Sequence, residues 1–114
     1  MTVAKSKNYS DNNYSMPVDF TKRLNFFSML SDNVRHNIIA TLLDRKECSV
    51  SQLIDALNKP QTLVSYHLRV LKESGIVKSQ KSKSDGRQTL YSLVEPKTIN
   101  ELFSIADNFV EKNA

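Results

Sequence analysis

The twenty residues from Asn58 to Val77 read NKPQTLVSYHLRVLKESGIV and contain the most informative pattern in the chain. Val64, Leu68 and Leu71 recur at helical spacing, which predicts an amphipathic helix from about Pro60 to Ser74. The opposite side of this helix is polar and carries two cations. The helix therefore has one side suited to a protein core and another suited to solvent or a ligand.

Both ends of this helix have recognisable signals. Asn58 tolerates the left-handed conformation that a tight helix–helix turn needs, and Pro60 presets the first turn of the next helix. Gly75 is predicted to terminate the helix in the left-handed conformation. Just upstream, a short helix capped by Ser49 or Ser51 is predicted, with Val50, Leu53, Ile54 and Leu57 on one face.

A β-hairpin is predicted immediately after Gly75. Residues 76–81 (IVKSQK) form a plausible strand, residues 82–86 (SKSDG) a turn, and residues 89–93 (TLYSL) the return strand. The Asp85-Gly86 pair within the turn is a strong hairpin signal. Two short helices joined by a three-residue turn and followed by a two-stranded ribbon predict a winged helix-turn-helix.

The remaining segments predict three further helices, with Pro17 near the start of the first, Ser31 or Asp32 capping the second and Pro96 opening the last. We therefore expect a mainly α (α+β) fold with five helices and a two-stranded β wing. Residues 1–15 are expected to be a disordered arm and residues 16–114 a single domain. The apolar stripes are Phe20, Leu24, Phe27 and Leu30 in the first helix, Val34, Ile38 and Leu42 in the second, and Ile99, Leu102, Phe103, Ala106, Phe109 and Val110 in the last.

Composition and charge restrict the class of protein. The 114 residues are 39% hydrophobic with a mean hydropathy of −0.42, and no apolar run approaches the ~18 residues of a membrane span. The net charge is +4, yet residues 59–91 hold seven Lys or Arg against two acidic residues, so this third carries +5 and the rest −1. Such a concentration is typical of a surface that meets phosphates. No catalytic triad order, phosphate-binding glycine loop or paired carboxylates indicates an enzyme.

The predicted fold and the charge together point to double-stranded DNA. A helix fits the major groove of B-DNA while a basic hairpin lies along the neighbouring backbone. Which side chain reads a base is left open. The groove-facing candidates are Gln61, Thr62, Ser65, Tyr66, Arg69 and Lys72, and the candidates for backbone or minor-groove contact are Lys59, Lys81, Lys83, Ser84 and Arg87.

The sequence resembles the ArsR/SmtB-type winged-helix transcriptional regulators. Residues 30–35 (LSDNVR) are similar to the family's "LADPTR" segment, and residues 64–77 match its recognition-helix signature "VSxHLxxLxxxGLV" with correct spacing. Gly86-Arg87 and residues 91–93 (YSL) resemble the family's wing. The resemblance spans about residues 30–93, over half of the chain.

This resemblance implies a homodimeric DNA-binding repressor whose dimer is built from the first and last helices. A two-fold dimer would present its recognition helices roughly 34 Å apart to a palindromic promoter operator. The apolar stripes fit this, because a small chain has limited interior in which to hide both of them. The expected interface residues are Phe20, Leu24, Phe27, Leu102, Phe103, Phe109 and Val110.

The chain departs from the family at both of its familiar metal-sensing sites. Where many members carry "ELCVCDL", this chain has residues 47–53 as ECSVSQL, so serines replace both cysteines. A serine hydroxyl is a poor ligand for soft metals, which bind thiolates. The last helix offers Asp107 and Glu111 but no histidine for a zinc site. We therefore expect neither a metal nor a cofactor.

Three residues have alternative interpretations. His67 and His36 are expected to be packed or hydrogen-bonded histidines, because no second ligand lies nearby in the sequence. Cys48, the single cysteine, is expected to be a small semi-buried residue. A redox role, as a sensor thiol or in a disulfide between protomers, is the minority hypothesis, since Arg45 and Lys46 could lower its pKa.

The sequence thus predicts a cytoplasmic, sequence-specific, homodimeric regulator of transcription that represses by occupying a promoter. Two alternatives stay open: a nonspecific architectural DNA-binding protein with the same fold, and a winged-helix module that binds proteins. The operator sequence, the target genes and any inducer are not specified by the sequence.

Overall fold

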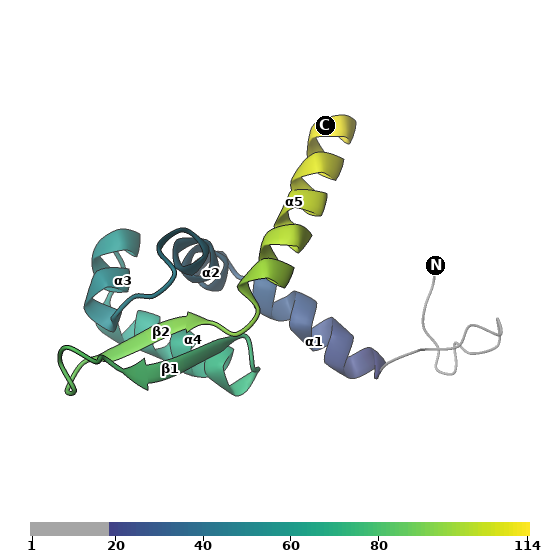
Figure 1. The fold of residues 1–114 in the computed structure, drawn as a ribbon. Coiled ribbons are helices and arrows are strands. Elements are labelled where there is room, and N and C mark those ends of the chain that lie inside the picture. Colours follow the sequence, from purple (N-terminus) through teal and green to yellow (C-terminus); the bar gives the residue numbers. More distant parts are fainter. Residues whose placement is uncertain (1–18) are drawn as a thin grey trace.

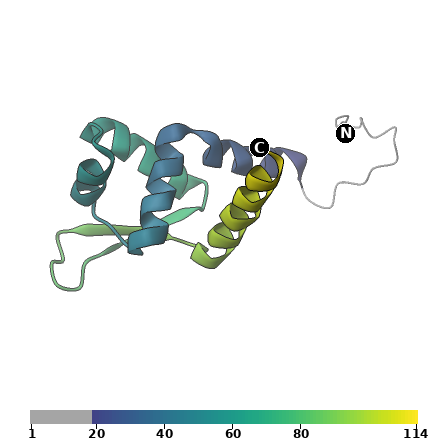
Figure 2. The same ribbon diagram turned by 90° about the horizontal axis from the view of Figure 1, so that it is seen from above.

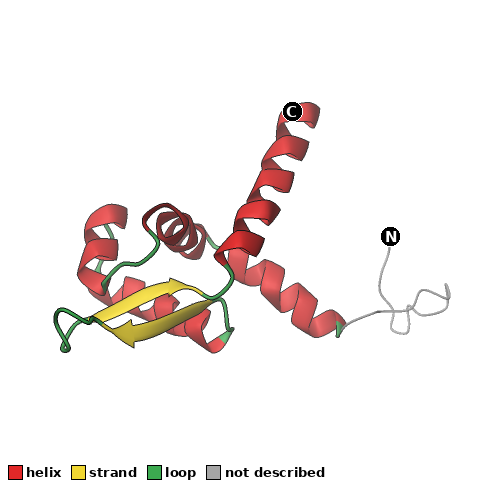
Figure 3. Ribbon diagram, viewed as in Figure 1, coloured by secondary structure: helices red, strands yellow, loops and turns green. Residues whose placement is uncertain are grey.

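The computed structural model describes residues 19–114, which form five helices and one two-stranded antiparallel sheet (Figures 1 and 3). The elements are α1 (Phe20–Ser31), α2 (Asn33–Arg45), α3 (Val50–Leu57), α4 (Gln61–Glu73), β1 (Val77–Lys81), β2 (Thr89–Leu93) and α5 (Pro96–Asn113). This order confirms the predicted winged helix-turn-helix. The predicted arm of residues 1–15 and the helix start at Pro17 lie outside the described residues.

The core is formed where α2, α3 and α4 pack together and against the sheet. Val64, Leu68 and Leu71, the predicted inward residues of α4, are each at most 1% exposed. Burying a side chain of this size contributes about 1.5–3 kcal/mol to the free energy of unfolding. The buried side chains of α4 therefore fix this helix against the core. Within residues 19–114, the buried apolar residues are Ile38, Ile39, Leu42, Cys48, Leu53, Val64, Leu68, Leu71, Ile76, Val77, Leu93 and Ile99.

The boundaries of the helix-turn-helix, α3 and α4, follow from turn chemistry. Asn58 ends α3 in the left-handed conformation, with φ 55°, and its N–H donates to the Ile54 carbonyl at 2.8 Å. Gly75 has φ 78°, as predicted. The Ile76 N–H donates to the Leu71 carbonyl at 3.0 Å, which completes a Schellman cap. The strand expected from Ile76 therefore begins one residue later.

The wing consists of β1, β2 and the loop between them. The register places Val77 opposite Leu93 and Lys81 opposite Thr89. In the loop, the Gln88 N–H donates to the Asp85 carbonyl at 3.0 Å, but Gly86 does not adopt a positive φ. A loop spanning residues 82–88 is longer than the two-residue connections that need mirror-image turns. The hairpin is confirmed, but its turn differs from the usual Asp-Gly type.

A third short segment joins the sheet and was not predicted. Cys48, in the connection between α2 and α3, forms an isolated antiparallel bridge with Tyr91 of β2. The Cys48 N–H donates to the Tyr91 carbonyl at 3.0 Å, and the Tyr91 N–H donates back at 2.8 Å. This pairing attaches the start of the helix-turn-helix to the wing.

Helices α1 and α5 lie at the end of the molecule opposite to the wing loop (Figures 1 and 2). No residue of α1 is buried, and Ile99 is the only buried residue of α5. The C-terminal part of α5 extends away from the core (Figure 1). Within residues 19–114, no helix combines the length and the apolar character needed to cross a membrane.

Candidate nucleic-acid interface

The polar face of α4 is open to solvent along its whole length. All six residues predicted to face a DNA groove are exposed, while Val64 and Leu68 between them are buried. The structure thus places the candidates on one continuous surface of α4. These six residues are Gln61, Thr62, Ser65, Tyr66, Arg69 and Lys72.

Arg69 and Tyr66 form a small cluster at the middle of this surface. The Arg69 guanidinium carbon lies 5.3 Å from the centre of the Tyr66 ring, and Arg69 Nη1 lies 3.6 Å from Glu73 Oε2. Both contacts are exposed, and an exposed ion pair contributes little free energy. Arg69 can therefore exchange the Glu73 carboxylate for a base edge or a phosphate at small cost.

The wing presents a second group of exposed cations. The Arg87 side chain is 95% exposed, and its Nε lies 3.7 Å from Asp85 Oδ1. Lys81 Nζ donates to Thr89 Oγ1 at 3.5 Å, which orients the lysine along the outside of the hairpin. The other predicted backbone contacts, Lys59, Lys83 and Ser84, are exposed as well.

Polar contacts with α2 hold α4 in addition to the core. His67 is 7% exposed, and its Nδ1 lies 3.3 Å from Arg35 Nη1 while its Nε2 lies 3.8 Å from Asp32 Oδ2. The backbone N–H of Arg35, aided by the charge of the Arg35 guanidinium, lowers the pKa of the Asp32 carboxyl despite the opposing effect of burial. The expectation of a hydrogen-bonded His67 is confirmed.

His36, in contrast, stacks on Phe103 of α5 with ring centroids 5.0 Å apart. Arg35 lies in the segment that resembles the family, but no function was predicted for it from the sequence.

Cys48 is fully buried, more completely than the semi-buried position expected for it. Burial raises the pKa of the Cys48 thiol, and this effect outweighs the attraction of the Arg45 guanidinium. The minority redox hypothesis relied on nearby cations that could lower this pKa, but the bridge to Tyr91 places the thiol inside the core. A redox role for Cys48 therefore requires the surrounding structure to open first.

Alkylation of Cys48 tests this burial. Because less thiolate is present when the pKa is raised, we expect iodoacetamide at neutral pH to label the folded protein at least about tenfold more slowly than the urea-unfolded protein. The measurement is the labelling rate by mass spectrometry. Equal rates in the two states would contradict the buried position.

The positions that the family uses to sense metals do not form a metal site within residues 19–114. Ser49, at the position of a sensor cysteine, is buried and forms a capping box: its Oγ accepts from the Gln52 N–H at 3.2 Å, and Gln52 Oε1 accepts from the Ser49 N–H at 2.8 Å. Within residues 19–114, no group of three or more His, Cys, Asp or Glu side chains is arranged to hold a metal ion.

Comparisons with known proteins agree on one family. The profile described as "Bacterial regulatory protein, arsR family" matches residues 32–79. An uncharacterized HTH-type transcriptional regulator of Methanocaldococcus jannaschii is 32% identical over 88 residues, covering 77% of this chain and 94% of that protein. The HTH-type transcriptional repressor SmtB of Mycobacterium tuberculosis is 42% identical over 66 residues, covering 58% of this chain and 46% of SmtB.

A solved structure extends the likeness to the fold. The crystal structure of Mycobacterium tuberculosis Rv0081 superposes with a TM-score of 0.72 and 27% identity, covering 86% of this chain and 93% of that chain. The match therefore includes elements on both sides of the helix-turn-helix.

Proposed function

The chain belongs to the ArsR family of bacterial regulatory proteins and is a DNA-binding transcriptional regulator rather than an enzyme; from this premise we propose that it is a cytoplasmic homodimeric repressor that occupies a palindromic promoter operator. The observation that carries the proposal is the separation of two surfaces. The basic wing lies at the opposite end of the molecule from α1 and α5 (Figures 1 and 2). The exposed side chains of α4 are mostly polar, whereas those of α1 and α5 include large apolar residues.

Exposed apolar side chains on α1 and α5 support the dimer. Large hydrophobic residues this exposed, gathered on two neighbouring helices, are typical of an interface between subunits. A groove of about 400 Å³ lies between α1, α2 and α5 and is lined by Phe27, Leu102 and Phe103 among others. The exposed residues are Phe20, Leu24, Phe27, Ile105, Phe109 and Val110.

The dimer set expected from the sequence needs two refinements. Phe103 and Leu102 are half-buried, and Phe103 packs on the chain's own core, so only part of each is free for a partner. Ile105 is 69% exposed and was not predicted. Helical spacing could have identified it, because it lies four residues before Phe109 on the same face.

We assign base reading to α4 and backbone contact to the wing. Arg69 has the paired donors, and Gln61 the donor and acceptor, for bidentate contacts with bases. Thr62 and Ser65 have short side chains, so they could contact only bases close to the helix. The wing cations Lys81, Lys83 and Arg87 carry the positive charge suited to contacts with phosphates.

The absence of thiolate and histidine ligands at the usual positions supports a further part of the proposal. Ser49 is occupied in the capping box that starts α3. We therefore infer that any signal received by this regulator is not a soft metal bound at α3.

Selection of bound fragments from genomic DNA, followed by footprinting of one of them, tests the proposal as a whole. We expect a two-fold symmetric site that is bound at least about 10³-fold more tightly than unrelated duplex. Binding with a steep salt dependence but no preferred sequence would indicate an architectural protein. Absence of DNA binding would indicate a protein-interaction module.

Substitutions in the wing and in α4 are expected to differ in kind. Lys83→Ala should weaken binding to every duplex and lower the slope of log K against log salt by about 0.9 per lost phosphate contact. Arg69→Ala should cost roughly 1–3 kcal/mol on the operator and relax the preference at one base pair. The measurement is binding to operator and scrambled duplexes at several salt concentrations. If both variants weakened all duplexes equally, α4 would not read bases.

A further inference from the structure

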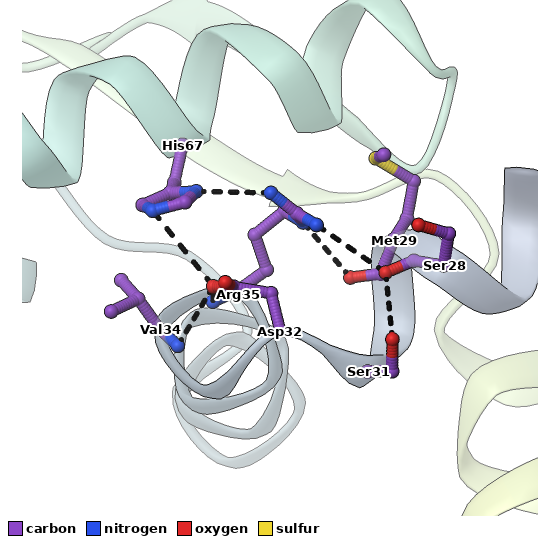
Figure 4. A network of polar contacts seen from close by, with 7 residues as sticks. All are labelled: Ser28, Met29, Ser31, Asp32, Val34, Arg35 and His67. Carbon is purple, nitrogen blue, oxygen red and sulfur yellow. Dashed lines mark hydrogen bonds and ion pairs between the residues drawn. The ribbon is translucent and has the colours of Figure 1, made fainter.

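Arg35 connects three elements through its guanidinium group (Figure 4). Its Nε donates to the Met29 carbonyl at 3.1 Å and its Nη2 to the Ser28 carbonyl at 3.3 Å, both in the last turn of α1. Its Nη1 lies 3.3 Å from Nδ1 of His67 on α4. A single side chain of α2 thus contacts both the end of α1 and α4.

These contacts supply hydrogen-bond donors to carbonyls at the end of α1. The last four carbonyls of a helix accept no hydrogen bond from a backbone N–H of the same helix. In α1, the carbonyls of Ser28 and Met29 are two of these four. Only one other side chain contacts this turn among the bonds drawn in Figure 4: Ser31 Oγ donates to the Ser28 carbonyl at 3.0 Å. Arg35 therefore acts as a cap that attaches α1 to α2.

The same geometry defines the hydrogen-bonding state of His67. Arginine can only donate, so Nδ1 of His67 is the acceptor, and the neutral ring carries its proton on Nε2. Nε2 faces Asp32 Oδ2 at 3.8 Å. Asp32 itself caps α2 by accepting from the N–H groups of Val34 at 3.0 Å and Arg35 at 3.1 Å. His67 is therefore held from two sides by residues at the start of α2.

His67 is also in contact with the surface assigned to DNA. Its ring meets the Tyr66 ring edge-on with centroids 5.0 Å apart. Tyr66 in turn lies beneath the Arg69 guanidinium. Contacts thus run without interruption from the carbonyls of α1, through Arg35 and His67, to two candidate DNA-reading side chains.

We propose that Arg35 and His67 are positioning residues that set the orientation of α4 relative to α1, and hence the separation of the two recognition helices in the dimer. The inference rests on the proposed function, since it requires α1 to be part of the dimer interface and α4 to enter the groove. Neither residue is fully exposed, and neither is among the residues assigned to contact DNA. Their role is to make one half-site spacing fit better than others.

The test compares variants that keep or remove the hydrogen bonds. In His67→Gln, the amide oxygen can accept from Arg35 while the amide N–H₂ faces Asp32. His67→Met has similar volume and neither group. Arg45→Met is the matched control, because Arg45 is the other arginine of α2, is exposed and lies at the far end of that helix. For each variant, we would measure the thermal unfolding midpoint and the affinity for the operator, for operators with one base pair inserted or deleted at the centre, and for a scrambled duplex.

We expect His67→Met to bind the operator about 10-fold more weakly, the factor for one lost hydrogen bond to a charged group. Its affinity for scrambled duplex should be unchanged, and its preference for the native spacing over the altered spacings should shrink. His67→Gln should restore most of that preference, and Arg45→Met should match the wild type. A purely structural role would lower the unfolding midpoint but leave the spacing preference of the folded fraction intact.

A folded His67→Met protein with the wild-type spacing preference overturns the proposal. If that variant does not fold, Arg35→Lys decides: it keeps the charge, but one ammonium group cannot reach the α1 carbonyls and His67 together. Wild-type spacing preference in Arg35→Lys likewise overturns the proposal. Failure of the proposed function is separate and is seen first, as a wild-type protein that is monomeric or that prefers no sequence.

Discussion

The Phe109→Glu protein is expected to be a monomer that binds the operator at least about 100-fold more weakly than the wild type, a loss of ~2.7 kcal/mol or more. Phe109 is 66% exposed on the outer part of α5, next to Val110 and one turn after Ile105. In a two-fold interface each substitution occurs twice. Each copy loses the burial of a phenylalanine, about 1.5–3 kcal/mol, and places a carboxylate in an apolar contact. A monomer also engages one half-site instead of two.

Sedimentation and operator binding are the two measurements. The matched control is Ser104→Glu, which adds the same charge to the other side of α5, where the side chain is exposed and polar. We expect Ser104→Glu to remain dimeric and to bind normally. A dimeric Phe109→Glu protein with full affinity would show that α5 is not part of the interface.

The Leu68→Ala protein is expected to lose about 2–5 kcal/mol of its free energy of unfolding. Leu68 is 1% exposed and lies at the centre of the inner face of α4. Its truncation removes apolar contacts and leaves a cavity that the neighbouring helices cannot fully close. Because small domains have only about 5–15 kcal/mol in total, this one change removes a large fraction of the stability.

Denaturant unfolding measures this loss, and Leu63→Ala on the same helix is the control. Leu63 is half-buried, so its truncation should cost less than that of Leu68. Operator binding by the Leu68→Ala protein should fall with the folded fraction on warming, without a change in sequence preference. Equal costs at the two positions would contradict the orientation of α4.

Much of the fold could be predicted because its signals are local. Apolar spacing identified the inner faces of α2, α3 and α4, and the residues at those positions are either buried or partly buried against the core. The left-handed conformations of Asn58 and Gly75 follow from the small steric cost at these two residues. The outward direction of the candidate DNA-reading residues then follows, since a helix with one buried face must expose the other.

The parts that could not be predicted depend on residues far apart in the chain. Arg35 and His67 are 32 residues apart, and nothing in their spacing indicates a contact. The Cys48–Tyr91 bridge is a further example, because it buries the thiol and the burial raises the thiol pKa. Neighbours in sequence suggested an activated thiol, whereas neighbours in space remove it from water.

The amino-acid order alone therefore specifies which segments are helices, where they stop and which of their faces is polar, because spacing and capping act over a few residues. Folding in three dimensions decides the rest: which loop pairs with the wing, which arginine joins α1 to α4, and which apolar side chains of α1 and α5 remain uncovered. Those outcomes depend on how complete elements pack against one another, and no short pattern in a chain encodes that geometry.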